Sequence, residues 1–405
     1  MLNKISKENF ILLILFLSIL RFGIAFIYGD STYEMEWGVI VKNLLSDSSF
    51  SYHEIDGQKI PTVYMPPLYV YLIYIVTFFG FSEFATVKII LFFQCLFSGI
   101  SIFFFYKILL NLFNERYAVL FSLIYFLIPL NFYSATQISS VSFQISIFIF
   151  FFYYYLNAKT NFQFIILGIF SGLAILIRGE FWLLFLILTF YKIVTGKIKL
   201  TKLFHLIFIT FLIISPTIIR NYIVFDKFVL TQSSGYNLWR GNSLSKNING
   251  ENVEIYEIKK KKEEIKNKLI ELNEIEKYEI YLDKLYFNIA KANIFNDPIK
   301  YIGHYINKFF AYSFFNFFSN YPNNFHPLII IPEIVISLFG ILGILQNIFS
   351  KKINYELLII TFFYLALIPI FFVLPRYKLF IFPMYTIFSC YLFAFLSNKI
   401  FSKKQ

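Results

Sequence analysis

Three carboxyl groups lie within seven residues near the start of the chain. Asp30, Glu34 and Glu36 follow directly on the apolar stretch 9–29. A carboxyl group at the edge of a membrane has a raised pKa unless a cation pairs with it, and such a group suits removal of a proton from an attacking hydroxyl or amine. If a helix begins near Tyr33, Glu34 and Glu36 point to different faces of it. The alternative is an acidic loop in which Asp30 only caps a helix, and the sequence leaves both interpretations open.

Five cationic residues share a second pattern, because each lies at the end of an apolar stretch or just beyond it. They are Arg178, Arg220, Arg240, Arg376 and Lys378. Several guanidinium groups that converge can bind a phosphate or pyrophosphate. The alternative is that each side chain reaches separately to lipid headgroups, which long basic side chains do at membrane surfaces.

A tandem proline marks a corner in the chain. Pro66 and Pro67 precede Leu68 and Tyr69. Proline forces the residue before it into an extended conformation and fits the first turn of a helix. The pair therefore predicts an abrupt helix start at the membrane surface.

The elements that position these residues follow from the composition. Of the 405 residues, 58% are hydrophobic and 15% are charged, whereas soluble domains carry roughly 25% charged residues. Twenty-one of the 60 charged residues lie between Glu251 and Lys300. This distribution excludes an ordinary soluble enzyme, a disordered chain and a disulfide-rich module. It predicts an all-α polytopic membrane protein with one sizeable aqueous segment.

A membrane-spanning helix needs about 20 largely apolar residues, and ten stretches meet this requirement approximately. They are 9–29, 88–107, 117–135, 141–157, 162–178, 180–195, 203–219, 327–349, 355–374 and 379–398. The first is expected to be an anchor rather than a signal peptide, because it contains Arg21 and lacks a small-residue cleavage site. Lys and Arg in the short loops predict that both termini are cytoplasmic, so that 30–87 and 220–326 lie on the outer face. The predicted units are 1–219 (transmembrane module), 220–326 (extracytoplasmic segment) and 327–405 (last transmembrane helices).

Two further apolar stretches, 66–80 and 301–318, would break this charge pattern if they crossed. Fifteen helical residues reach only about 22 Å, short of a hydrocarbon core of about 30 Å. We expect both to be interfacial or re-entrant helices on the outer face, although a true span stays open for either. Apolar residues between 256 and 290 recur at steps of three, four and seven, which predicts an amphipathic helix or helical hairpin. Asp297 and Pro298 predict a helix restart after it.

Other classes of site find little support. The sequence has no phosphate-binding glycine loop, no dinucleotide motif and no paired Cys or His spacing typical of a metal site. Cys95 and Cys390 lie inside apolar stretches and are expected to be buried small residues. The net charge of +12 lies mostly in short loops between apolar stretches, which indicates a membrane partner rather than a nucleic acid.

Several of these segments together resemble the family 39 glycosyltransferases of the GT-C fold, the group that includes protein O-mannosyltransferases and lipid A aminoarabinose transferases. The resemblance covers nearly the whole chain and rests on six short motifs in the same order. The motifs are Asp30–Leu45, Pro66-Pro67-Leu68-Tyr69, Ile177-Arg178-Gly179-Glu180, Ser215–Tyr222, Gly235-Tyr236-Asn237-Leu238 with Gly241-Asn242, and Pro375-Arg376-Tyr377-Lys378.

The resemblance implies a polyprenyl-phosphate sugar donor, an inverting transfer and an active site at the outer face of the cytoplasmic membrane. The acceptor would be a lipid, a glycan or a protein. The base would be an acid in the first outer loop, with Glu36 favoured over Glu34 and Asp30. The donor phosphate would be bound by Arg376, Lys378, Arg220 and Arg178. The substrate pocket would include Tyr69, Pro66, Pro67, Tyr377, Asn242 and Arg240.

The sequence departs from the family pattern at two places. The usual Asp-Glu pair is not cleanly present in the first outer loop. Many relatives also carry Thr-Glu shortly after Tyr-Ser, whereas here Tyr133-Ser134 is followed by Ser139-Ser140. The missing second carboxylate disfavours a divalent metal, and no metal-binding residue is assigned.

Two other functions would also place arginines and aromatic residues at the outer face. One is a transporter or flippase of lipid-linked sugars, and the other is a polymerase or ligase of surface polysaccharides. A transporter is expected to show paired repeats and charged residues near mid-membrane. Apart from Arg21 and Lys88, which lie near the ends of predicted spans, the sequence shows neither feature.

Overall fold

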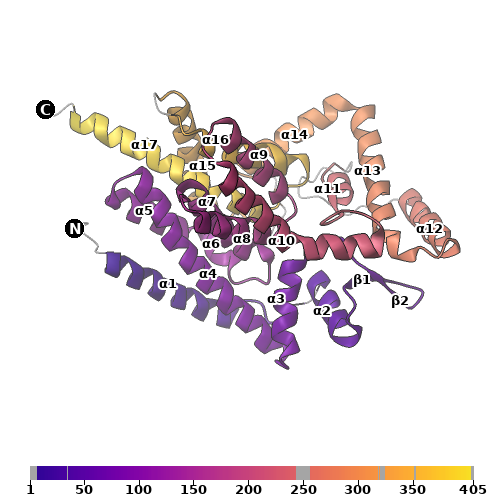
Figure 1. Ribbon diagram of the computed structural model, residues 1–405. Helices are drawn as coiled ribbons and strands as arrows, with labels where there is room; N and C mark the ends of the chain where they lie inside the picture. Colours follow the sequence, from indigo (N-terminus) through magenta and orange to yellow (C-terminus); the bar gives the residue numbers. More distant parts are fainter. Residues whose placement is uncertain are drawn as a thin grey trace.

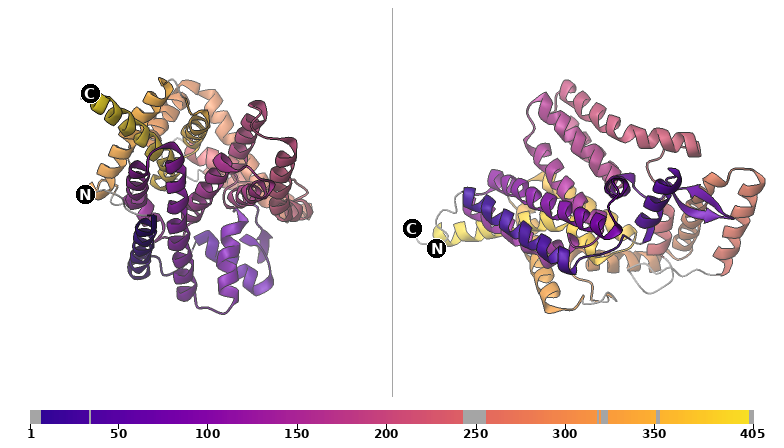
Figure 2. Two further views of the ribbon diagram at one scale, coloured as in Figure 1. Left: turned by 60° about the vertical axis from the view of Figure 1, so that its left-hand side comes forward. Right: turned by 90° about the horizontal axis from the view of Figure 1, so that it is seen from below.

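The computed structural model describes residues 7–33, 35–242, 256–317, 319, 324–350 and 353–402. Most of these residues are helical, as predicted. Figures 1 and 2 show both chain termini at one end of a helical bundle, with β1, β2, α12 and α13 at the opposite end. The chain is therefore a polytopic bundle whose polar segment lies away from the termini.

Among the described residues, five helices are long and apolar enough to cross a membrane. They are α1 (Lys7–Tyr28), α4 (Glu83–Leu112), α7 (Ser140–Asn157), α10 (Leu200–Phe225) and α15 (Pro327–Ile348). The other five predicted spans fall on further helices, and the total of ten stays a prediction. These helices are α5 (Glu115–Leu127), α8 (Asn161–Ile177), α9 (Phe181–Val194), α16 (Tyr355–Leu367) and α17 (Phe382–Ser402).

Prolines mark helix breaks within or next to three of the predicted spans. The stretch 117–135 is not one helix, because Pro129 begins a separate helix, α6 (Pro129–Ser134). Two α5 carbonyls next to the break accept hydrogen bonds from side chains. The Asn131 amide donates to Tyr125 O at 3.0 Å and Arg21 donates to Phe126 O at 2.9 Å. In the same way, the short helix η2 (Ile368–Ile370) follows α16, and η3 (Pro375–Phe380) precedes α17.

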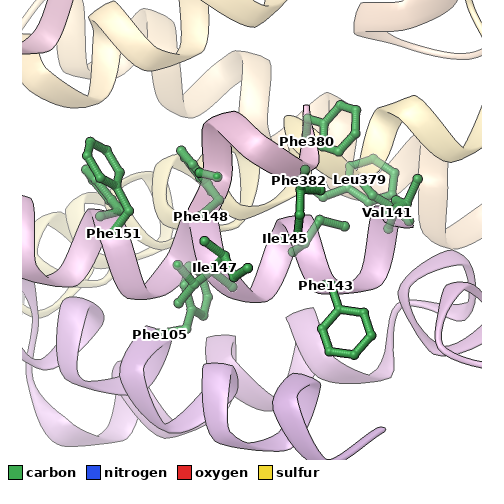
Figure 3. Close-up of a cluster of buried hydrophobic side chains, with 14 of the residues drawn as sticks. Phe105, Val141, Phe143, Ile145, Ile147, Phe148, Phe151, Leu379, Phe380 and Phe382 are labelled. Atoms are coloured by element: carbon green, nitrogen blue, oxygen red, sulfur yellow. The ribbon is translucent and has the colours of Figure 1, made fainter. Parts of the chain in front are cut away.

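Helix α7 lies at the centre of the bundle, with 13 of its 18 residues buried. Figure 3 shows Phe148 and Phe151 of α7 among side chains from distant segments, including Phe105 of α4 and Phe380 of η3. A helix that is apolar on all sides is expected in the core of a large membrane bundle. Helix α7 therefore fixes the positions of the segments around it.

A polar cap lies at the end of the bundle away from the termini. It consists of β1 (Ser51–Ile55), β2 (Gln58–Pro61), α11 (Ser234–Gly241), α12 (Tyr256–Glu271), η1 (Ile275–Lys277) and α13 (Tyr278–Asn296). Helices α12 and α13 form the predicted hairpin, which reverses where Asn273 has a φ of 52°. Helix α14 (Pro298–Ser313) begins after Asp297, as predicted. The Asp297 side chain accepts the Lys300 amide at the N-terminus of this helix.

The two strands were not predicted. They pair in antiparallel fashion around Asp56 and Gly57, which have φ values of 51° and 82°. A two-residue turn of this kind needs positive φ at both positions, and Asp-Gly is a favoured pair for it. This dipeptide was the available sequence signal for the hairpin.

Two short helices join the cap to the bundle. They are α2 (Met35–Asp47) and α3 (Pro67–Phe78). Pro66 is extended, with φ of −61° and ψ of 132°, and Pro67 begins α3, which confirms the predicted corner. Helix α3 runs across the direction of α1 and α4 (Figure 1). The interfacial positions expected for α3 and α14 remain predictions.

Candidate active site

A cavity of about 930 Å³ lies where the bundle meets the polar cap. Its walls come from the segment after α1, the start of α2, the Pro66 corner, the α6–α7 loop, the α8–α9 turn, α11, and the segment from η2 to η3. Seven residues predicted for the site line it. They are Asp30, Glu36, Pro66, Arg178, Arg240, Arg376 and Tyr377.

Glu36 lies in the first turn of α2 and is half-buried. Within the described part of the chain, no hydrogen bond or ion pair engages its carboxyl group. Burial raises the pKa of Glu36, while the positive charges of Arg240 and Arg376 act in the opposite direction. An unengaged carboxyl group with a raised pKa can accept a proton from a substrate. Glu36 therefore has the properties of a general base.

Asp30 also lines the cavity, but its carboxyl group has a protein partner. Asp30 Oδ2 accepts the Ile138 amide at 2.6 Å. The Asp30 amide donates to Thr136 O at 3.1 Å, and Lys88 Nζ donates to Asp30 O at 3.0 Å. Asp30 thus ties the end of α1 to the α6–α7 loop, which is a structural task. Glu34, the third predicted acid, lies outside the described residues.

Arg178 is already neutralised by a neighbouring acid. Its Nε donates to the Glu180 carboxylate within the α8–α9 turn. Its guanidinium group also lies 4.8 Å from the ring centre of Tyr377 and 4.8 Å from that of Phe380. Cation–π contacts of this kind hold a guanidinium plane in one orientation. Arg178 is therefore held in one orientation at the cavity wall, and the Glu180 carboxylate offsets its positive charge.

Arg240 and Arg376 form a cationic wall opposite Glu36. The Arg240 guanidinium lies 4.7 Å from the ring centre of Phe372. Arg376 is exposed, and its guanidinium lies 6.0 Å from the ring centre of Tyr377. Both charges act on the Glu36 carboxyl group, so the two basic residues and the acid share one electrostatic site.

Two predicted phosphate-binding residues do not line the cavity. Lys378 is 1% exposed and donates to the Glu333 carboxylate and, at 2.8 Å, to Phe314 O. Arg376 and Lys378 are two residues apart in η3. Because such a helix has about three residues per turn, they point in different directions. Lys378 therefore lies outside the cavity lining, with its ammonium group directed to Glu333.

Arg220 is likewise occupied with protein groups. It donates to Thr62 O at 2.7 Å and to Phe50 O at 3.1 Å. These carbonyls belong to the segments on either side of the β-hairpin, so Arg220 attaches this hairpin to α10. Arg220 therefore lies outside the cavity lining, and its guanidinium group donates to backbone carbonyls next to the β-hairpin.

Three predicted pocket residues lie behind the cavity wall. Tyr69 is buried, donates to Gln94 Oε1 at 2.9 Å and packs its ring 5.1 Å from Trp37, which does line the cavity. Pro67 is buried at the start of α3. Asn242 donates to Leu238 O at 2.8 Å and to Ile370 O at 2.9 Å. These residues support the wall instead of facing the substrate space.

Some lining residues were missed by the sequence predictions. They include Trp37, Tyr64, Ser139, Ser140, Glu180 and Asn237. Each is in or next to a segment singled out from the sequence, and that position was the only signal. Among the described residues, no group of three or more His, Cys, Asp or Glu side chains could hold a metal ion.

A buried acid of the cap was also missed. Glu279 of α13 accepts the amides of Val63 and Tyr64 at 2.8 and 3.1 Å and the Thr62 hydroxyl at 2.9 Å. Burial raises the pKa of Glu279 to about 7. Tyr64 and Pro66 line the cavity. The Glu279 carboxyl group therefore attaches α13 of the polar cap to the cavity wall.

Comparison with known proteins defines the class of this architecture. The Archaeoglobus fulgidus oligosaccharyltransferase tethered with an acceptor peptide is similar over 97% of this chain and 50% of its own, with a TM-score of 0.55 and 14% identity. The same enzyme, AglB, in complex with an inhibitory peptide and a dolichol-phosphate is similar over 99% of this chain and 52% of its own (TM-score 0.51, 14% identity). The chain thus has the GT-C fold and spans about half the length of these structures.

The sequence itself gives a shorter match. Residues 64–219 match the family described as dolichyl-phosphate-mannose-protein mannosyltransferase, which agrees with the resemblance seen in the motifs. ArnT from Cupriavidus metallidurans bound to undecaprenyl phosphate shows a weaker likeness (TM-score 0.43, 12% identity, 96% of this chain and 77% of that chain). A comparison with curated protein sequences found no match.

Proposed function

We propose that this protein is a membrane glycosyltransferase that moves a sugar from a polyprenyl-phosphate donor to an acceptor hydroxyl or amine. The observation that carries the proposal is the pairing of an unengaged acid, Glu36, with Arg240 and Arg376 in one cavity at the edge of the bundle. The GT-C fold and the family match of residues 64–219 support the same activity.

The proposed reaction uses the two walls for opposite tasks. Glu36 accepts the proton of the acceptor O–H or N–H as its oxygen or nitrogen attacks the anomeric carbon. The bond from that carbon to the phosphate oxygen breaks, and its electron pair stays on the phosphate. Arg240 and Arg376 stabilise the charge that develops there. Because the attack comes from the side opposite the phosphate, the anomeric configuration is inverted.

The cavity also has an apolar part that suits a lipid chain. Its lining includes Val141, Ile177, Leu183, Leu367 and Leu374. A donor anchored by a polyprenyl chain would keep the phosphate at the arginines while the chain extends into the membrane. The dolichol-phosphate in the AglB complex supports a donor of this class.

The proposed location is the outer face of the cytoplasmic membrane. The cavity lies on the side of the polar cap, away from the termini (Figure 1), and Lys and Arg in the loops of the other side favour a cytoplasmic position for that side. The acceptor is a lipid, a glycan or a protein that reaches the cavity from this face.

The proposal is tested with the purified protein in lipid vesicles. Lipid-linked sugars that accumulate in a deletion strain, identified by mass spectrometry, provide the donor to be assayed. Glu36→Gln is expected to lower the rate of sugar transfer by at least about 10²-fold, because the amide cannot accept the proton. The matched control is Glu54→Gln, since Glu54 is an exposed acid of β1. Full transfer by a correctly inserted Glu36→Gln protein would refute the base assignment. Accumulation of no such lipid would argue against the donor class.

A further inference from the structure

Helix α11 carries Arg240 and Asn237 into the cavity, yet it is a poor helix by itself. It has eight residues, two of them glycine. Isolated helices shorter than about 12 residues are marginal in water, and glycine weakens a helix further. Its N-cap residue, Ser233, makes no side-chain capping bond. The position of Arg240 must therefore be set by contacts from other elements.

An acid from α13 occupies the N-terminal end of α11. Asp283 is 4% exposed, and its Oδ1 accepts the Tyr236 amide at 2.8 Å, while its Oδ2 accepts Gln232 Nε2 at 2.7 Å. The amides of a first helical turn lack partners within the helix and carry a partial positive charge. Asp283, which belongs to another helix, accepts an amide at the N-terminus of α11 in place of the Ser233 side chain.

A base from α14 occupies the C-terminal end. Lys308 is fully buried, and its ammonium group donates to Gly241 O at 3.0 Å and to Asn242 Oδ1 at 3.0 Å. It also donates to Phe371 O at 2.7 Å, in the segment that carries the Phe372 ring beside Arg240. A cation is favoured at the negative end of a helix. Lys308 makes no ion pair with the acids of the described residues, and burial lowers its pKa to about 7. Its ammonium form therefore depends on these carbonyl oxygens.

The fit at both ends is tight. A Cβ atom at Gly235 would lie 2.1 Å from Asp283 O, and one at Gly241 would lie 2.3 Å from Phe371 O. Both glycines are therefore needed for α11 to approach α13 and η2 this closely. The helix is seated between a buried acid, which accepts from its N-terminal amides, and a buried base, which donates to its C-terminal carbonyl.

We propose that Asp283 and Lys308 are positioning residues that hold α11 from its two ends and thereby orient Arg240 toward the donor phosphate. Neither residue lines the cavity, so both act through α11. This inference rests on the proposed function, in which Arg240 binds the phosphate of a polyprenyl-phosphate donor.

The test measures binding of a polyprenyl phosphate without sugar to the purified full-length protein, by titration in native mass spectrometry. Lys308→Met is expected to weaken binding about tenfold, because loss of a charged hydrogen-bonding group costs about that factor or more. Lys308→Arg, which keeps the charge, is expected to restore most of the affinity. Asp283→Asn supplies a second variant in case Lys308→Met does not fold, and it is expected to change the affinity in the same direction. Lys300→Met, at an exposed lysine of the same helix, is the matched control.

The decisive comparison repeats Lys308→Met in an Arg240→Gln protein. If Lys308 acts through Arg240, the loss caused by Lys308→Met shrinks to less than about twofold there, since two changes on one path do not add. An equal loss in both backgrounds would overturn the inference and leave the proposed function intact. Unchanged binding by Arg240→Gln alone, or no binding by the unaltered protein, would overturn the phosphate site and the inference together.

Discussion

The bundle and the polar cap are held together in different ways. The bundle is organised around one continuous cluster of buried apolar residues, to which all five of its long helices contribute. Among the described residues, the cap shows three small clusters of three or four buried apolar residues each, and one of them is shared with α10. The buried groups Glu279, Asp283 and Lys308 and the half-buried Arg220 make many of its connections instead.

This difference bears on how the cavity is built, because the cavity lies where the two regions meet. Apolar contacts depend little on direction, whereas a hydrogen bond to a buried charged group restricts both distance and angle. The bundle therefore provides a stable support, and the cap places the polar groups that would contact a substrate. Changes in the bundle should affect stability first, and changes at the junction should affect activity first.

The largest effect is expected at the junction itself. Glu36→Gln should lower the rate of sugar transfer by about 10² to 10⁴-fold, the usual contribution of a general base, with little change in thermal stability. Asp30→Asn should cost less, because Asp30 accepts the Ile138 amide through one carboxyl oxygen and an amide oxygen can do the same. Transfer rates and melting temperatures of the two purified variants check this. A greater loss in rate for Asp30→Asn would make Asp30 the base.

The next effect contrasts two glycines. A Cβ atom at Gly343 in α15 would lie 2.0 Å from Phe388 O of α17, whereas one at Gly303 in α14 would meet nothing within 4 Å. Gly343→Ala should destabilise the bundle by about 1–3 kcal/mol through overpacking. Gly303→Ala should leave stability equal or raise it by up to about 1 kcal/mol, because alanine favours a helix. Unfolding in detergent, followed by circular dichroism, measures both, and equal behaviour of the two variants would contradict the expected packing.

A smaller effect concerns pH and the cap. The pKa of Glu279 is raised by burial to about 7 from its ordinary value of 4.5. The folded state therefore binds a proton that the unfolded state has lost between these values, and stability falls as pH rises through this window. The contribution of protonated Glu279 to the free energy of unfolding is fully present below pH 4.5 and is lost above about pH 7.

Thermal unfolding at pH 5 and pH 8 tests this expectation. The melting temperature of the unaltered protein should fall from the lower to the higher pH by more than that of Glu279→Gln, whose amide does not titrate. The same pH dependence in both proteins would assign the effect to another group.

The smallest effect is a shift of a pH profile. Burial raises the pKa of Glu36, and Arg240 and Arg376 partly oppose that change. Removing a positive charge with Arg376→Gln should raise this pKa further and move the acidic limb of kcat/KM to higher pH. Arg116→Gln, at the exposed start of α5, is the control. An acidic limb that stays in place in Arg376→Gln would mean that Glu36 is not the group that titrates.

Much of the fold was predictable because its signals are local. The apolar stretches, the Pro66-Pro67 corner and the restart at Asp297 and Pro298 each depend on neighbouring residues only. The acidic residues of the site could be predicted for the same reason, since Asp30 and Glu36 are close in the sequence. The β-hairpin had a local signal in Asp56-Gly57, which was overlooked.

The basic wall was predictable only in part. Arg240 and Arg376 come from segments 136 residues apart, and both line the cavity. Lys378 was chosen with Arg376 from the same short motif, but the tight turn of η3 directs it to Glu333 instead. Residue type and approximate depth in the membrane do not determine the direction of a side chain.

The sequence by itself determined that this is a helical membrane protein with acids after its first helix and arginines at the ends of later ones, because hydrophobic periodicity and turn chemistry act over short distances. Only the tertiary structure decided which of these charged groups share a cavity and which form hydrogen bonds that hold the polar cap in place. That choice depends on contacts such as those of Glu279 with Tyr64 and of Lys308 with Gly241. Such partners are separated by tens to hundreds of residues and meet only when the helices have packed.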